Sequence, residues 1–144
     1  MEKEDAAIYS FFVREKDRAV IVQDAATDYL GNDPQQMVDS IKSSFKELSS
    51  ETLDSYVERN KEPSQLSPDM DLGTDYVLRS AEEASQGSDE YFMFSRVGFN
   101  QAPDQALVHV GDVACPLAGS GFYYLMEKKD GQWSVKQSMM VWIS

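Results

Sequence analysis

The segment FYYLMEKKDGQWSVKQSMMVWI, residues 122–143, decides the fold because it predicts its own strand pairing. Asp130-Gly131 favours a two-residue hairpin turn, since both residues tolerate positive φ. Such a turn pairs Lys129 with Gln132, and each step away from it pairs the next residue on either side. One side then gathers Phe122, Tyr124, Met126, Trp133, Val135, Met139 and Val141, while the other pairs Tyr123 with Ser138, Leu125 with Lys136, and Glu127 with Ser134. We therefore predict an antiparallel pair whose apolar side is buried beneath N-terminal helices.

The rest of the second half also predicts strands. Runs rich in β-branched and aromatic side chains occupy residues 75–80, 91–99 and 105–110. The stretch AEEASQGSDE, residues 81–90, is typical of a polar loop. Residues 63–75, PSQLSPDMDLGTD, contain two prolines and a glycine and indicate a surface connection. We therefore expect antiparallel β-structure over residues 76–144.

Residues 1–62 predict mainly helices, with one short strand near 18–25. Residues 6–14 carry apolar side chains at helical spacing, whereas Val20-Ile21-Val22 is a β-branched run that favours a strand. Asp33 followed by Pro34 is a typical helix start. Ser49 or Ser50 caps a further helix, which ends before Pro63.

Together these elements predict a single α+β domain over residues 1–144. Two or three N-terminal helices should pack on one face of a mainly antiparallel sheet of four to six strands. This element order resembles the cone-shaped cystatin and nuclear-transport-factor folds, in which helices wrap a curved antiparallel sheet. Such folds host many unrelated functions, so the resemblance implies architecture alone.

Charge and composition exclude several classes of partner. The chain has 25 acidic and 13 basic side chains and a net charge of −12, which argues against binding to nucleic acid or to an anionic membrane surface. It lacks an apolar run long enough for a membrane helix, and its start does not have the pattern of a signal peptide. We expect a cytoplasmic protein, or an exported one if Met1 replaces a removed signal peptide. A single cysteine excludes an internal disulfide.

The segment HVGDVACPLAGSG, residues 109–121, holds the only histidine and the only cysteine. A nucleophilic site would need the Cys115 thiolate, His109 as base and Asp112 to orient the base. Strand alternation instead points His109 to the side of Leu107, which predicts a half-buried strand histidine. One histidine and one cysteine do not make a metal site, and the glycines lack the lysine of a phosphate loop, so we predict no metal and no cofactor.

A candidate binding site remains in this region. We expect the glycines to allow a wide connection of about ten residues between strands, and long ordered loops are often functional. Arg96 interrupts an apolar run and has two interpretations: an ion pair with Asp24, Glu90 or Asp112, or a contact to an anionic ligand group. The candidate site residues are Arg96, His109, Asp112 and Cys115.

Several motifs of the second half together form a distinctive pattern. They are SRVGFN (residues 95–100), QALVHV (105–110), LAGSG (117–121), YYL (123–125), EKKDGQW (127–133) and WIS (142–144). In these motifs the chain resembles a group of small bacterial proteins to which no activity is assigned. The resemblance covers about fifty residues well and the helical half loosely. It implies a shared fold and supplies no catalytic residue.

These observations predict a non-catalytic binding or protein-interaction module, with a protein or a small molecule as its partner. One alternative is a small cone-fold enzyme for a hydrophobic small molecule, with His109, Arg96 or an aspartate as its acid–base group. Another is an acidic inhibitor or nucleic-acid mimic. A deep pocket that receives His109 or Arg96 would favour the enzyme, and acids spaced like phosphates on one face would favour the mimic.

Overall fold

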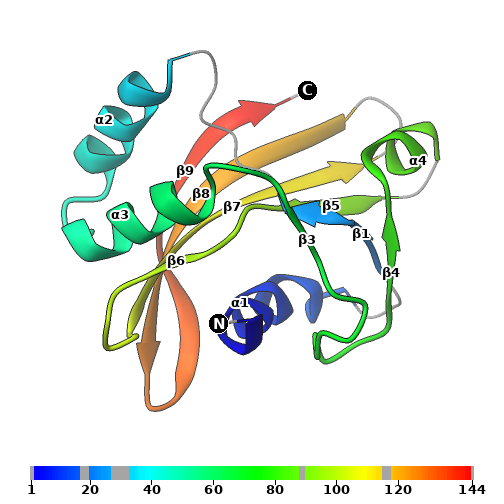
Figure 1. The fold of residues 1–144 in the computed structure, drawn as a ribbon, viewed down its shortest axis with the longest axis horizontal. Coiled ribbons are helices and arrows are strands. Elements are labelled where there is room, and N and C mark those ends of the chain that lie inside the picture. Colours follow the sequence, from blue (N-terminus) through cyan, green and yellow to red (C-terminus); the bar gives the residue numbers. More distant parts are fainter. Residues whose placement is uncertain (1, 17–19, 27–32, 88–89, 115–117, 144) are drawn as a thin grey trace.

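One mixed sheet organises the chain, and its strand order differs from the order of the sequence (Figure 1). The computed structural model describes residues 2–16, 20–26, 33–87, 90–114 and 118–143. The sheet runs β4-β1-β5-β7-β8-β9, and the short β6 also pairs with β7. Its strands are β1 Val20–Gln23, β4 Tyr76–Arg79, β5 Tyr91–Phe94, β6 Gly98–Phe99, β7 Gln105–Ala114, β8 Ala118–Lys129 and β9 Gln132–Ile143. The predicted α+β class, with helices on a mainly antiparallel sheet, is confirmed.

The sheet departs from the prediction at its β4 edge. β4 and β5 both lie parallel to β1, and only the pairs from β5 to β9 are antiparallel. The expectation of purely antiparallel structure after residue 76 is therefore wrong for β4, because its partner comes from the N-terminal half. A separate two-stranded sheet joins β2 Ala25–Ala26 to β3 Ser64–Gln65.

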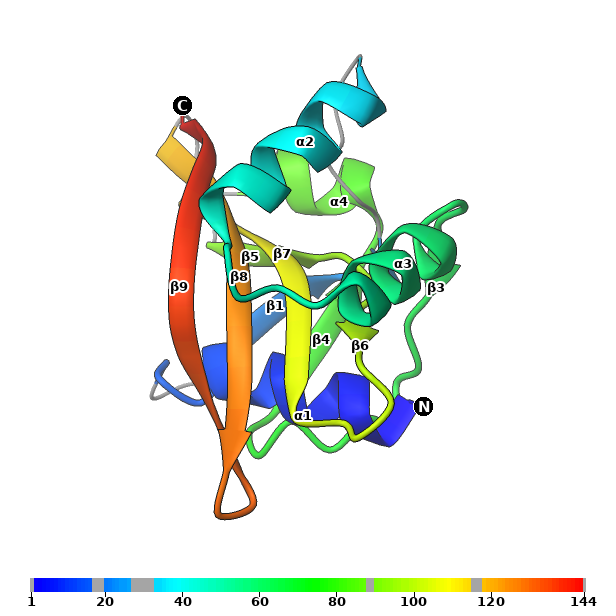
Figure 2. The same ribbon diagram turned by 90° about the vertical axis from the view of Figure 1, so that its left-hand side faces the viewer.

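Helices cover both faces of the sheet rather than one (Figure 2). α1 Glu2–Val13 packs on the face that carries Ala106, Val108 and Val110 of β7. α2 Pro34–Ser44 and α3 Ser50–Arg59 pack on the opposite face, which carries Leu107. Because side chains alternate along β7, neighbouring residues of this one strand build two separate hydrophobic cores.

The predicted helix starts at Asp33 and Ser49 are confirmed, whereas α1 begins at Glu2 rather than at residue 6 and α4 was missed. Asp33 accepts a hydrogen bond from the backbone N–H of Gln36, and Ser49 accepts one from Thr52. The expected polar loop after residue 80 begins instead with α4 Ala81–Gln86, which has a capping box between Ser80 and Glu83. A serine three residues before a glutamate is the sequence signal of such a box, so the helix could have been predicted.

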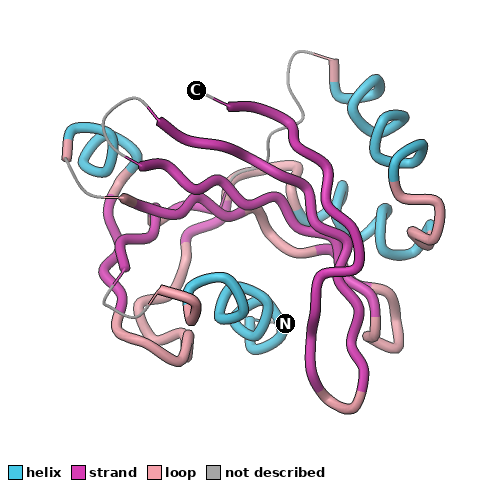
Figure 3. Tube along the Cα trace, turned by 180° about the vertical axis from the view of Figure 1, so that it is seen from behind, coloured by secondary structure: helices cyan, strands magenta, loops and turns pink. Residues whose placement is uncertain are grey.

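The C-terminal hairpin has the predicted turn, with φ of 53° at Asp130 and 77° at Gly131. It projects as an arm from the sheet (Figure 3). The predicted register holds from Lys129–Gln132 to Met126–Val135, but an irregularity then pairs Leu125 with Gln137 and Tyr123 with Met139. The predicted partners Lys136 and Ser138 are therefore wrong by one residue.

This irregularity decides which core each half of β9 joins. Tyr124 and Trp133 both pack against the α1 core, as predicted, whereas Met139 and Val141 pack against the α2–α3 core. The extra residue in β9 moves the side chains that follow it to the other face, as far as a second irregularity between Phe122–Met140 and Gly121–Trp142. Since helices cover both faces, both sets of apolar side chains are partly buried, whereas Val135, which the prediction placed on the buried side, is 37% exposed.

The predicted strand over residues 91–99 is broken at Ser95–Val97, between β5 and β6. Here the Asn60 side chain makes the backbone hydrogen bonds that a neighbouring strand would otherwise make. Its Oδ1 accepts from the Arg96 N–H at 2.8 Å, and its Nδ2 donates to the Arg96 C=O at 3.0 Å. Asn60 directly follows α3, so this pair of bonds fixes the Arg96 backbone to the end of that helix.

Candidate functional site

The residues predicted as a site lie apart in the structure. His109 lies on the α2–α3 face of β7, while Asp112, three residues further on, pairs with Phe92 and lies on the α1 face. Arg96 lies in the break between β5 and β6. Cys115 lies outside the described residues. The structure therefore does not bring His109, Asp112 and Arg96 together.

His109 is a buried residue, only 3% exposed, and burial lowers its pKa to about 4. The Trp142 indole Nε1–H donates to Nε2 of the imidazole at 3.3 Å. An indole N–H can only donate, so Nε2 accepts and the ring is neutral, with its proton on Nδ1. The Tyr123 ring packs edge-on against the imidazole, with 5.2 Å between ring centroids. This histidine packs in the core.

The glycines of the 109–121 segment make room for Trp142. The expected wide connection is wrong, since β7 and β8 continue to pair from Gly111–Gly121 as far as Ala114–Ala118. A Cβ on Gly121 would lie 2.0 Å from Trp142 Nε1, and a Cβ on Gly111 would lie 3.0 Å from Cζ2 of the same ring. The glycines therefore let the indole lie flat against the strands and reach His109.

Asp112 belongs to a charged cluster on the α1 face of the sheet. Lys16 Nζ lies 3.2 Å from Glu90 Oε1 and 3.6 Å from Asp112 Oδ2. Burial raises the pKa of Asp112, the Glu90 carboxylate adds to this shift, and Lys16 opposes it. Lys16 also lies over the Phe92 ring. The cluster ties the end of α1 to β5 and β7, which is a structural role.

Arg96 forms an ion pair that the sequence did not suggest. Its Nε lies 3.0 Å from Oδ2 of Asp5, and Nη2 of Arg59 lies 2.9 Å from the same oxygen. Arg59 also donates from Nη1 to the Val97 carbonyl. Burial raises the pKa of Asp5, while Arg59 and Arg96 oppose the shift. The predicted partners Asp24, Glu90 and Asp112 are replaced by Asp5 because Asn60 holds Arg96 beneath α1.

A signal for Asp5 was present in the sequence. Asp5, Ile8 and Tyr9 lie three and four residues apart, on the same stripe of α1, and all three are buried. An acidic residue on the apolar stripe of a helix needs a cation within the core. Spacing shows this need, but it does not show that the cations come from residues 59 and 96.

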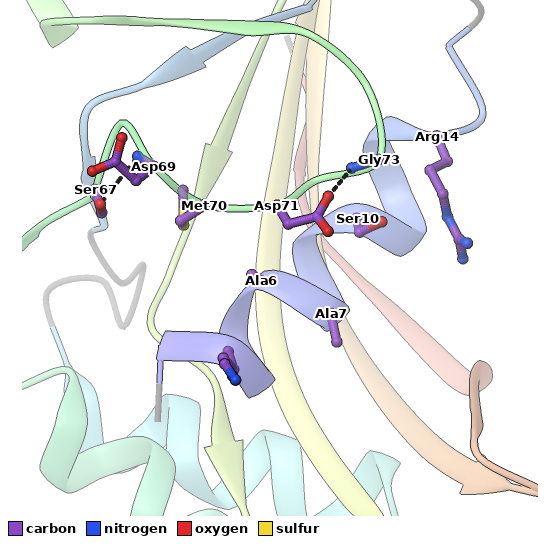
Figure 4. Close-up of a pocket in the computed structure, with 10 residues that line it drawn as sticks. Ala6, Ala7, Ser10, Arg14, Ser67, Asp69, Met70, Asp71 and Gly73 are labelled. Carbon is purple, nitrogen blue, oxygen red and sulfur yellow. Dashed lines mark hydrogen bonds between the residues drawn. The ribbon is translucent and has the colours of Figure 1, made fainter.

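A groove runs between α1 and residues 67–73 (Figure 4). Its volume is about 840 Å³, within the range of about 300–1,000 Å³ that is common for ligand sites. α1 contributes Lys3, Ala6, Ala7, Ser10 and Arg14, and the facing segment contributes Ser67, Asp69, Met70, Asp71 and Gly73. None of these residues had been predicted as part of a site.

The groove wall opposite α1 is fixed at both of its ends. Leu66 and Leu72, 8% and 1% exposed, are members of the α1 core, so the expected surface connection is anchored on either side of residues 67–71. The Tyr76 hydroxyl donates to the Ser67 carbonyl at 3.1 Å. Asp71 Oδ1 accepts from the Gly73 N–H at 3.1 Å. The groove is therefore formed before a ligand arrives.

The charges in the groove balance, although those of the whole chain do not. Lys3 and Arg14 stand against Asp69 and Asp71 in the groove, whereas the chain carries a net charge of −12. Ala6, Ala7 and Met70 add apolar surface. Such a lining suits a ligand that is neutral or carries both signs of charge. The described residues of the lining include neither histidine nor cysteine.

Comparisons with known proteins do not identify a family or a relative for this chain. No protein-family model, no curated protein and no solved structure matches the chain. The resemblance to a bacterial group and to cone-shaped folds therefore stays a prediction. Across the described ranges, no three His, Cys, Asp or Glu side chains gather as a metal site would require. Within the same ranges, every helix is too short or too polar to cross a membrane.

Proposed function

We propose that this protein is a non-catalytic binding module whose ligand occupies the groove between α1 and residues 67–73. The observation that carries the proposal is the preformed groove itself, with both walls fixed by the core and a charge-balanced lining. Neither His109 nor Asp112 lines this groove, and the aspartates that do line it, Asp69 and Asp71, are exposed to solvent. The proposal therefore favours binding over the enzyme alternative.

Filling the groove tests this function. Ala7 is exposed and lines the groove, so Ala7→Trp should block ligands and leave the core unchanged. Ala81, the first residue of α4, is also exposed but lies outside the groove, so Ala81→Trp is the matched control. The measurement is ligand-observed NMR with a fragment library of neutral, cationic and anionic compounds.

We expect compounds that bind the wild type and Ala81→Trp but lose at least tenfold in affinity for Ala7→Trp. Circular dichroism and thermal unfolding would show that both variants are folded. If the affinity of every bound fragment is unchanged by Ala7→Trp, or if no fragment binds at all, the groove is not a ligand site.

A further inference from the structure

The exposed large apolar side chains of the described residues lie on the two edge strands of the sheet. They are Val77 on β4 and Val135, Met140 and Ile143 on β9. β4 and β9 are the two ends of the strand order, so each has one side without a neighbouring strand in the described part of the chain. The unpaired backbone N–H and C=O groups along such a side are a template for a further strand.

β9 is the longer of the two edge strands, and it has few of the features that keep an edge from pairing (Figure 2). Its 12 residues include no proline and no acidic residue, although the chain carries 25 acidic side chains. Its one charged residue is Lys136, whose ammonium group lies 2.5 Å from Glu47 and 3.2 Å from Glu127 of its own chain. Two copies of this acidic protein can therefore meet along β9 without placing carboxylates of the strand against each other.

The three exposed apolar side chains of β9 share one face of the sheet. Side chains of directly opposite residues in paired strands lie on the same face. On β8, residues 120, 122, 124 and 126 alternate onto the face of α1, because Tyr124 and Met126 pack in the α1 core. The β9 residues opposite 120, 122 and 126 are Ile143, Met140 and Val135. The two irregularities in the β8–β9 pairing therefore place all three exposed side chains on the α1 face.

We infer that β9 pairs antiparallel with β9 of a second copy of this chain, about a two-fold axis that passes Met139. A two-fold axis makes such a contact self-complementary, so residues equally far from Met139 on either side lie opposite each other. Val135 then lies opposite the partner's Ile143, and Met140 lies opposite the partner's Ser138, all of them on the α1 face. Each exposed valine thereby packs against an exposed isoleucine.

The two faces of β9 select this register. Gln137, Met139 and Val141 lie on the α2–α3 face. With Met139 at the axis, Gln137 lies opposite the partner's Val141, so side chains of the two copies meet on matching faces from residue 135 to residue 143. An axis one residue away, at Ser138, would place Val135 of the α1 face opposite the partner's Val141 of the other face. An axis at residue 136 would oppose two lysines.

The product of this pairing is a closed dimer. A contact of β9 with itself occupies the same edge of both copies, whereas pairing of β9 with β4 of the next copy would leave an open edge at each end and continue without limit. β4 has four residues and β9 has 12, so β9 finds an edge of matching length in another β9. None of the described groove residues lies within residues 135–143, so this inference is independent of the proposed function.

Sedimentation velocity of the full chain over a concentration series tests the dimer. We expect the mass to rise from one chain to two as the concentration increases from about 1 μM to about 500 μM. Val135→Glu places a carboxylate at the contact and should raise the dissociation constant at least tenfold. Val77→Glu makes the same change on the exposed edge of β4 and is the matched control, which should dimerise like the wild type. A wild type that stays monomeric, assemblies larger than two chains, or equal weakening by both variants would overturn the inference.

Two double variants test the register. Residues 135 and 143 lie about 25 Å apart along one strand but opposite each other across the two-fold axis. In Val135→Lys/Ile143→Glu each new ammonium group faces a new carboxylate of the other copy, so this variant should dimerise. Val135→Lys/Val77→Glu has the same net charge without that pairing, and its dissociation constant should be at least tenfold higher. Circular dichroism would show that both variants are folded. Equal dissociation constants for the two would overturn the pairing about Met139.

Discussion

At the scale of single residues, Trp142 and His109 show how one contact can account for a whole sequence motif. The indole lies against Gly121 and donates to the imidazole, so the glycines, the histidine and the tryptophan serve the same packing arrangement. A histidine beside a cysteine in a glycine-rich stretch suggests catalysis when the sequence is considered alone. Here the same residues instead bury a neutral ring in the α2–α3 face of the sheet.

The buried histidine predicts a pH dependence of stability. Its pKa is about 4 in the folded state against 6.5 for the unperturbed group, so the unfolded chain binds the proton more tightly. The stabilisation is fully present above pH 6.5 and is lost as the pH falls toward 4. Such a shift corresponds to about 3 kcal/mol in the free energy of unfolding. Urea unfolding at a series of pH values measures it.

The control for this effect is His109→Gln, whose amide oxygen can still accept from Trp142 but does not titrate in this range. The raised pKa values of Asp5 and Asp112 act with the opposite sign, since their contribution is lost as the pH rises above the ordinary value of 3.8. The wild type and His109→Gln share those carboxylates, so the difference between their two pH profiles isolates the contribution of the histidine. Superimposable profiles would contradict the assignment.

At the scale of elements, the sequence predicts what depends on neighbours along the chain. The Asp130-Gly131 turn and the four pairs beside it follow from turn chemistry and alternation, and the caps Asp33 and Ser49 follow from local composition. The register shift near Leu125 does not follow, because it depends on cores that lie on both faces of the sheet. No pattern of alternation contains that information.

The groove between α1 and residues 67–73 could not be predicted from the sequence, for the same reason. Leu66 and Leu72 are two apolar residues in a segment rich in proline and polar residues, and only contact with α1 gives them a role as anchors of a groove wall. Arg96 was singled out correctly as an interruption, but its partner lies 91 residues earlier in the chain. Long-range partners are fixed by topology, and the parallel β4–β1–β5 part of the sheet was not expected.

The anchored wall leads to a prediction about Leu72. Leu72→Ala should lower the free energy of unfolding by about 2–5 kcal/mol, as truncation of a buried leucine does. It should also release residues 67–71 locally, so that their amide hydrogens exchange faster and fragment binding in the groove weakens. Hydrogen exchange followed by mass spectrometry measures the local effect.

Leu107→Ala provides the comparison, since Leu107 is equally buried but lies in the α2–α3 core. Leu107→Ala should lower the free energy of unfolding by a similar amount. It should leave amide hydrogen exchange at residues 67–71 unchanged under conditions in which the folded state dominates. Equal acceleration at these residues in both variants would mean that the wall has no separate anchor.

At the scale of the whole molecule, the net charge of −12 is a source of self-repulsion. Added sodium chloride should screen it and raise the melting temperature, and a gain of about 1 kcal/mol corresponds to roughly 2–4 °C for a chain of this size. Calorimetry across a salt series at pH 7 measures the trend. A melting temperature that falls with salt would show that attractive ion pairs, such as Arg59–Asp5, outweigh the repulsion.

The position of α1 also has a consequence for synthesis. The helix leaves the ribosome early, yet Arg59 and Arg96, which neutralise its buried aspartate, and the strands beneath it are translated later. A nascent chain that ends before residue 96 therefore exposes the apolar stripe of α1 to solvent or to chaperones. α1 can complete its packing on β7 and β8 only after these strands have been translated, so the groove beside α1 cannot form before then.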